Sequence, residues 1–169
     1  MKKTMLIILL VLACFAASAQ IPQPDPDTTA RHFLIVASID NLQEINAGKL
    51  ASAIATNGEV RSFGQMMEKD HGQAEQQLLQ LAKSKNIELP DAATSGIQPD
   101  LDLKKAGSDF DRLYVHAMVS SHNGAVQMFE SYATNGKDPT VKAFAKKLLP
   151  TLKAHLAAIK AIDEKLNYH

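Results

Sequence analysis

Apolar residues recur every three or four positions along four long stretches of this 169-residue chain. One of the clearest series lies in residues 59–85 and includes Val60, Phe63, Met67 and Leu78. This spacing places apolar side chains on one face of an α-helix, whereas no segment shows the strict alternation that is typical of a half-buried strand. A helix with one apolar face must bury it against another element. The sequence therefore predicts an all-α protein.

Turn-forming residues divide these stretches into separate helices. The helices are expected at residues 28–56, 59–85, 108–134 and 139–166. Asparagine–glycine pairs follow the first and third helices, and both residue types tolerate the left-handed conformation that ends helices. Asp27 or Thr28 is the expected N-cap of the first helix, and Asp138 that of the fourth. Residues 86–107 contain two prolines and two glycines, which predicts a long connection.

An internal repeat indicates how the helices are paired. Residues 55–58 read Ala-Thr-Asn-Gly, and residues 133–136 read the same. Both copies are followed by the same pattern, which consists of valine, a basic residue, any residue, phenylalanine and a small residue, in that order. Two similar hairpins joined by one long crossover form a common four-helix topology. We therefore expect residues 28–166 to form a four-helix bundle.

Four polar residues interrupt the apolar stripes, one in each helix: Glu44, His71, His122 and His155. Packing the stripes together would bring these side chains into the bundle core. Glu44 and His71 both lie ~18 Å from the first turn at ~1.5 Å per residue. His155 lies about one helical turn further from the second turn than His122 does. Pro150 precedes His155 and is expected to kink the helix there.

This set of side chains predicts a metal site in the bundle core. Neutral imidazole and carboxylate groups bind zinc, iron, manganese or copper. Glu68 lies three residues before His71, which makes it a further candidate ligand, and Asp70 is a candidate partner that would orient a ligand. Leu152 lies three residues before His155, where a carboxylate-bridged di-iron bundle would need glutamate. The pattern therefore disfavours a di-iron centre.

Two other functions remain open. A buried acid and its histidines can simply fix how helices pair, so a structural or interaction module without metal is the main alternative. A metal-dependent redox or hydrolytic enzyme is the second. Catalysis by side chains alone is not predicted, because the chain has no recognisable nucleophile elbow or phosphate-binding loop. The methionines near the stripes are interpreted as core filling.

The N-terminus predicts export. Lys2 and Lys3 precede an apolar run at residues 5–15, and residues 17–19 fit a cleavage site, so residues 1–19 are expected to be a signal peptide. The run is too short to span a bilayer. A proline-rich tether would then occupy residues 20–27. The expected location is the periplasm or the exterior, with lipid attachment at Cys14 as the alternative.

The composition of the mature chain excludes some partners and ligands. Cys14 is the sole cysteine, so cleavage after residue 19 leaves no disulfide and no thiolate metal ligand. Loss of Lys2 and Lys3 from the 18 basic residues leaves 16 against 18 acidic ones. This balance argues against a nucleic-acid partner held by phosphate contacts.

The chain resembles the domain of unknown function 4142 family over about residues 31–161. The matching residues are Glu44, Gly48, Leu50, Ala51, Val60, Phe63, Met67, Asp70, His71, Phe110, Asp111, Tyr114, Met118, Val119, His122, Phe144, Ala145, Leu149, Pro150 and His155. The resemblance implies a ferritin-like four-helix bundle in exported bacterial proteins, often described as outer-membrane or periplasmic. It implies no established activity.

Overall fold

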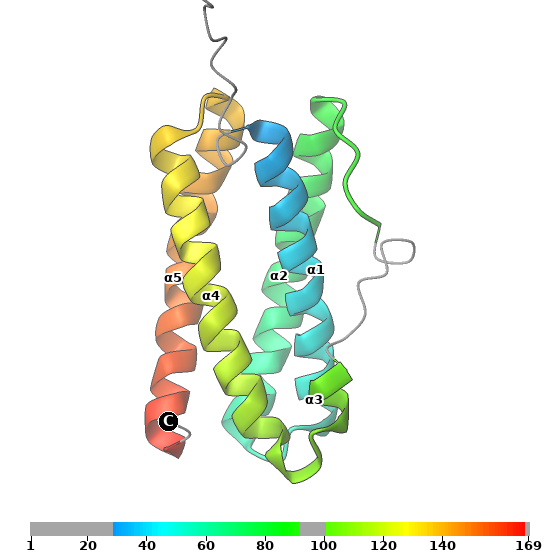
Figure 1. The fold of residues 1–169 in the computed structure, drawn as a ribbon, viewed down its shortest axis with the longest axis vertical. Helices are drawn as coiled ribbons and strands as arrows, with labels where there is room; N and C mark the ends of the chain where they lie inside the picture. Colours follow the sequence, from blue (N-terminus) through cyan, green and yellow to red (C-terminus); the bar gives the residue numbers. More distant parts are fainter. Residues whose placement is uncertain (1–28, 92–100, 168–169) are drawn as a thin grey trace, which may run out of the picture.

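Four long helices lie side by side and form the bundle (Figure 1). This computed structural model describes residues 29–91 and 101–167, so the expected signal peptide, Cys14 and the tether lie outside the described residues. The long helices are α1 (Ala30–Ile54), α2 (Gly58–Ser84), α4 (Phe110–Asn135) and α5 (Pro139–Leu166). A short helix α3 (Leu101–Lys105) and a 3₁₀ turn η2 (Gly107–Asp109) precede α4. No strand occurs in the described residues, which confirms the predicted all-α fold.

The helices form two hairpins. α1 packs mainly against α2, and α4 mainly against α5, while α1 also contacts α4 and α2 also contacts α5. The turn of the first hairpin lies at the lower end in Figure 1, and the turn of the second hairpin at the upper end. α2 therefore ends at the upper end of the bundle, whereas α4 begins at the lower end. This arrangement confirms the predicted ferritin-like topology of two hairpins and one long crossover.

The helices start at N-caps that differ in part from those expected. Thr29 caps α1, in place of Asp27 or Thr28, and its hydroxyl accepts from the backbone of His32 at 3.2 Å. Asp138 caps α5 as predicted, because its Oδ1 accepts from two backbone N–H groups at 3.0 Å. Asn57 was expected to end the first helix in a left-handed conformation. That reason is wrong: Asn57 has φ −77° and caps α2, which begins at the next residue.

Two glycines let α1 and α2 approach each other closely. A Cβ atom on Gly48 would lie 2.8 Å from the carbonyl oxygen of Gly64, and one on Gly64 would lie 2.7 Å from the Cβ of Ala51. Both distances are shorter than a real side chain tolerates. Glycine at these two positions therefore sets the spacing of the first hairpin.

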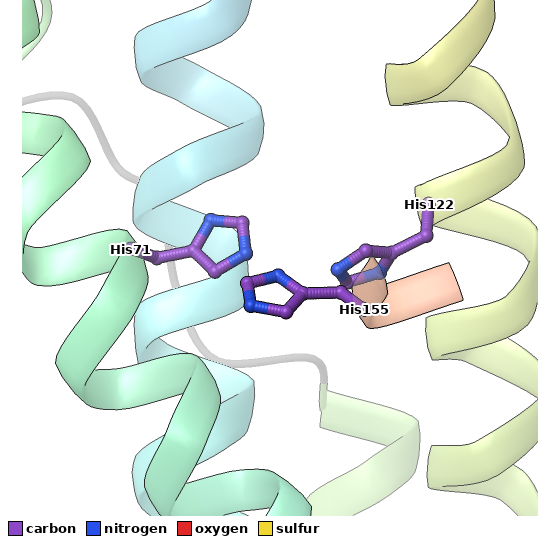
Figure 2. Close-up of side chains that lie close together, drawn as sticks. All are labelled: His71, His122 and His155. Carbon is purple, nitrogen blue, oxygen red and sulfur yellow. The ribbon is translucent and has the colours of Figure 1, made fainter. Parts of the chain in front are cut away.

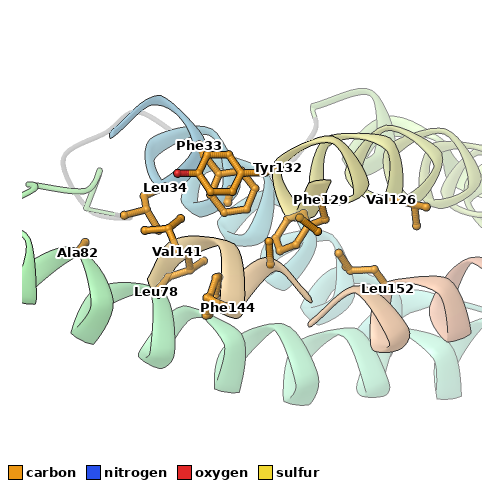
Figure 3. Packing of buried hydrophobic residues seen from close by; sticks show 13 residues of the cluster. Phe33, Leu34, Leu78, Ala82, Val126, Phe129, Tyr132, Val141, Phe144 and Leu152 are labelled. Carbon is orange, nitrogen blue, oxygen red and sulfur yellow. The ribbon is translucent and has the colours of Figure 1, made fainter. Parts of the chain in front are cut away.

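The buried apolar residues form two clusters, one toward each end of the bundle. Figure 3 shows the cluster at the end formed by the start of α1, where Phe33 stacks on Tyr132 with ring centroids 4.2 Å apart. The second cluster surrounds the α1–α2 turn and includes Phe63 and Tyr114. The level between the clusters carries buried polar residues instead. None of the described helices combines the length and apolar character that a membrane crossing requires.

Candidate metal centre

Three of the predicted residues meet between the two apolar clusters. His71, His122 and His155 project toward one another from α2, α4 and α5 (Figure 2). One ring nitrogen of each lies within 4.8 Å of those of the other two. The imidazoles are buried, with relative exposures of 6%, 1% and 3% respectively. The structure thus brings together the three histidines that the apolar stripes singled out.

The helical turn expected to separate His155 from His122 does not keep them apart. The ring centroids of His122 and His155 lie 5.6 Å apart. The ring centroid of His71 lies 5.6 Å from that of His122 and 5.4 Å from that of His155. Counted from the lower end of the bundle, the histidines lie 13, 12 and 11 residues along α2, α4 and α5. At ~1.5 Å per residue these heights are ~17–20 Å. α5 also runs as one helix through Pro150.

An asparagine fixes the orientation and tautomer of His71. The amide nitrogen of Asn41 donates to the carbonyl oxygen of His71 at 2.8 Å and to Glu75 Oε2 at 2.9 Å. Since both amide hydrogens are used, Asn41 Oδ1 must accept, and it lies 2.7 Å from His71 Nδ1. Nδ1 therefore carries the proton. Nε2 of His71 is left with its lone pair.

Acceptors fix the other two imidazoles in the same way. His122 Nδ1 lies 3.0 Å from the carbonyl oxygen of Met118, and His155 Nε2 lies 3.1 Å from Asp70 Oδ2. A carbonyl or carboxylate oxygen can only accept, so these two ring nitrogens carry protons. In the neutral form of each ring, the lone pair then lies on the other nitrogen, which is Nε2 in His122 and Nδ1 in His155. Asp70 lies where a partner that orients a ligand would lie.

The three nitrogens that hold lone pairs are buried and lack hydrogen-bond partners within the described parts of the chain: His71 Nε2, His122 Nε2 and His155 Nδ1. Burial, together with the neighbouring imidazoles, lowers the pKa of His71 to about 3. Burial and His155 lower the pKa of His122 to about 4. Both rings are therefore neutral at pH 7, and neutral imidazole is the form that binds metals. This donor set fits a metal ion with three nitrogen ligands.

Glu44 lies beside this group, and its oxygens are not among the atoms that come together. Its Oε1 is 3.4 Å from His122 Nδ1, the nitrogen already directed at Met118, and accepts from the Ser121 hydroxyl. Its Oε2 is buried without a hydrogen-bond partner among the described residues. Burial raises the pKa of Glu44 to about 7, the Ser121 hydrogen bond opposes this shift, and the charge of Asp40 adds to it.

Other residues of the region differ from expectation. Glu68, a candidate ligand from its spacing, is exposed and is not part of the histidine group. A buried network behind His71 was not predicted. In it Ser38 donates to Glu75 Oε1 at 2.9 Å, and Asn41 donates to the other oxygen of the same carboxyl. The available signal was that Ser38 and Asn41 share the helix face of Glu44, and that Glu75 lies one turn after His71.

A cavity of about 640 Å³, here called the central cavity, adjoins the histidines. Asp40, Glu44 and Ser121 line it on the side where α1 meets α4. On the side where α2 meets α5 its lining includes Gln77 and Lys147, and Lys147 Nζ donates to Gln77 Oε1 at 2.7 Å. The cavity is much larger than one metal ion requires, and its size lies in the range of small-molecule pockets.

Known structures share this fold. A DUF305 fragment from Deinococcus radiodurans matches with a TM-score of 0.69 at 14% identity, over 82% of this chain and 98% of that one. CopM, in a silver-bound form obtained by soaking, matches with a TM-score of 0.66 at 17% identity, over 81% of this chain and 96% of that one. At these identities the likeness concerns the fold alone.

No curated protein matches this sequence. Residues 15–162 match the family described as "Domain of unknown function (DUF4142)". This match spans most of the chain and agrees with the resemblance carried by its sequence motifs. The protein therefore belongs to the DUF4142 family.

Proposed function

We propose that this protein binds one transition-metal ion through His71 Nε2, His122 Nε2 and His155 Nδ1, and that it handles metal in the bacterial cell envelope. One observation carries the proposal: three buried imidazoles from three helices bring ring nitrogens within 4.8 Å of one another, and each ring has a buried nitrogen without a hydrogen-bond partner among the described residues. In the absence of a ligand these three buried nitrogens have no hydrogen-bond partner among the described residues, and leaving buried polar groups unpaired costs free energy. A bound cation compensates for all three at once.

The ligand atoms favour zinc or copper over harder ions. Three imidazoles suit both metals, whereas calcium and magnesium prefer oxygen ligands. Tetrahedral ligation at ~2.0–2.1 Å puts the nitrogens about 3.3–3.4 Å apart. One ring nitrogen of each histidine lies within 4.8 Å of those of the other two, so the rings need to move closer to reach this spacing. The silver bound to CopM, a protein of the same fold, supports a role in metal handling.

The cellular location is part of the proposal. Residues 1–19 read as a signal peptide, which supports export to the periplasm or the exterior. A role in envelope stress, through control of free metal, is compatible with that location.

The central cavity supports a second candidate function, a metal-dependent redox enzyme. Three protein ligands leave a coordination position for water or substrate, and the cavity offers space next to it. Peroxide-dependent turnover by the metal-loaded protein would favour this candidate over storage or transfer.

Elemental analysis tests the proposal directly. Protein without an affinity tag, purified without chelator and then loaded with Zn²⁺ or Cu²⁺, should retain about one ion per chain after desalting. The double variant His71→Ala with His122→Ala should lose that ion. The control variant His32→Ala with His116→Ala removes two histidines outside the centre and should keep it. The proposal would be contradicted if the metal content were well below one ion per chain and were the same in the wild type and in the first double variant.

A further inference from the structure

The central cavity is acidic where α1 meets α4. Asp40 and Glu44 are one helical turn apart on α1, and both line the cavity. Their burial increases inward: Asp40 is half-buried, Glu44 is 6% exposed and His122 is 1% exposed. Exposed Gln43 and Ser121 line the cavity on the same side. A row of acceptor groups thus leads from the surface to the first of the histidines.

Within the described parts of the chain, no lysine or arginine forms an ion pair with either of these two carboxyl groups. Like charges one turn apart destabilise a helix by a few tenths of a kcal/mol. Glu44 Oε2 is also buried and unpaired within the described chain. A metal cation between the two groups would offset both costs.

The opposite side of the cavity is less suited to an incoming cation. Lys147 lies there with its ammonium group hydrogen-bonded to Gln77, so one positive charge of α5 lies next to α2. The acid on that side, Asp70, already accepts from His155. An approaching metal ion therefore meets the Lys147 ammonium group on the α5 side. On the α4 side it meets two carboxyl groups that form no ion pair with a lysine or arginine among the described residues.

We infer that Asp40 and Glu44 form a transient binding site for the metal cation, through which the ion reaches the three imidazoles from the gap between α1 and α4. This inference rests on the proposed function. The carboxylate oxygens would replace part of the water around the ion before the nitrogens do. Glu44 lies 3.4 Å from His122 Nδ1, so the transient site borders the centre.

The kinetics of metal exchange distinguish a transient site from a permanent ligand. A transient site lowers the barrier in both directions, so its loss should slow uptake and release by the same factor and leave Kd unchanged. For Asp40→Asn and Glu44→Gln we expect both rates to fall roughly tenfold, the lower end of electrostatic effects on association. Stopped-flow absorbance with Cu²⁺ measures uptake, and excess chelator measures release. The slowing should diminish at high salt.

Two controls define the result. Asp163→Asn removes a carboxylate near the lower end of α5 and changes the net charge equally, so it should leave both rates unchanged. Lys147→Gln should not speed uptake, because the ion does not pass that side. Far-ultraviolet circular dichroism should show that all variants keep their helices.

The outcomes that overturn the inference differ from those that overturn metal binding. Wild-type rates in Asp40→Asn and Glu44→Gln, or faster uptake in Lys147→Gln, would refute the access route while metal binding survives. Faster release and weaker affinity in Glu44→Gln would make Glu44 a ligand of the bound ion and not a transient one. If the wild-type protein binds no Cu²⁺ at all, the proposed function fails and the inference fails with it.

Discussion

Each of the three imidazoles uses one nitrogen as a donor, and this choice determines what the other nitrogen can do. Asn41, the carbonyl of Met118 and Asp70 accept these protons. Partners of this kind raise the basicity of a ligand and fix its ring. At the scale of single residues, the acceptors are therefore as informative as the histidines.

Replacing Asn41 with alanine should weaken metal affinity. Without the amide, His71 loses its fixed tautomer, and loss of such partners typically costs about 10- to 100-fold in affinity. Asn123→Ala is a matched control, because it removes a half-buried amide that donates to the carbonyl of Val119. Competition with a metal indicator measures both variants. Equal affinities for the two would show that Asn41 does not position His71.

Acid should destabilise the metal-free protein through its histidines. The folded-state pKa values of about 3 for His71 and about 4 for His122 lie below the ordinary 6.5. Below about pH 6.5 the unfolded chain therefore binds more protons than the folded chain, so the free energy of unfolding decreases as the pH falls. Relative to the wild type, His71→Ala with His122→Ala should gain stability between pH 6.5 and 4. Urea unfolding at several pH values measures the difference, and a pH-independent difference would contradict the expectation.

Glu44 should have the opposite pH dependence. Its pKa of about 7 in the folded protein exceeds the ordinary 4.5, so the folded state binds more protons between these values. Stability from this group therefore falls as the pH rises through that window. Glu44→Gln cannot ionise and should gain stability relative to the wild type between pH 4.5 and 7.5. The same urea series tests this, and no relative gain by pH 7.5 would count against a buried, uncompensated carboxylate.

Among the elements, the first hairpin depends on the close approach of α1 and α2. Gly64→Ala forces a Cβ into backbone atoms of α1 and should destabilise the fold by about 1–3 kcal/mol. Gly72→Ala and Gly124→Ala are controls, because an added Cβ meets nothing within 4 Å at either position. These two should be stabilising by up to about 1 kcal/mol through helix propensity. Chemical denaturation measures whether each variant lowers or raises the free energy of unfolding.

The sequence predicted the four long helices because their apolar spacing is regular over seven turns or so. It did not predict α3, since five residues are too few to show a helical period. The asparagine–glycine turns were located correctly for an incorrect reason. Asn57 serves the helix that follows it, and an N-cap and a C-cap look alike when one helix begins where another ends.

The histidines could be found from the sequence because each one interrupts an apolar stripe. Asn41 and Glu75 share helix faces with Glu44 and His71, but their importance depends on a contact between α1 and α2 that this spacing alone does not reveal. The position of Glu44 beside His122 and outside the nitrogen group depends on side-chain orientation in the same way. The apolar stripes thus predicted the candidate ligands. The residues that hydrogen-bond to those ligands could be identified only once the packing of the helices was known.

For the molecule as a whole, metal should stabilise the bundle where its apolar packing is interrupted. The two clusters pack toward the ends, and the central cavity lies between the hairpins. A ligand at 100 times its Kd adds about 2.7 kcal/mol to the free energy of unfolding. Thermal unfolding with Zn²⁺ should therefore give a higher Tm than unfolding with chelator. The shift should vanish in His71→Ala with His122→Ala, and an undiminished shift there would point to binding elsewhere.

The three imidazoles come from both halves of the internal repeat. His71 belongs to the first hairpin, whereas His122 and His155 belong to the second. Glu44 in the first copy corresponds to His122 in the second, so the two halves no longer carry the same chemistry. Two identical copies of the first hairpin would carry two glutamates and two histidines at these positions, and two copies of the second would carry four histidines. The set of one carboxylate and three imidazoles therefore exists only because the two hairpins differ.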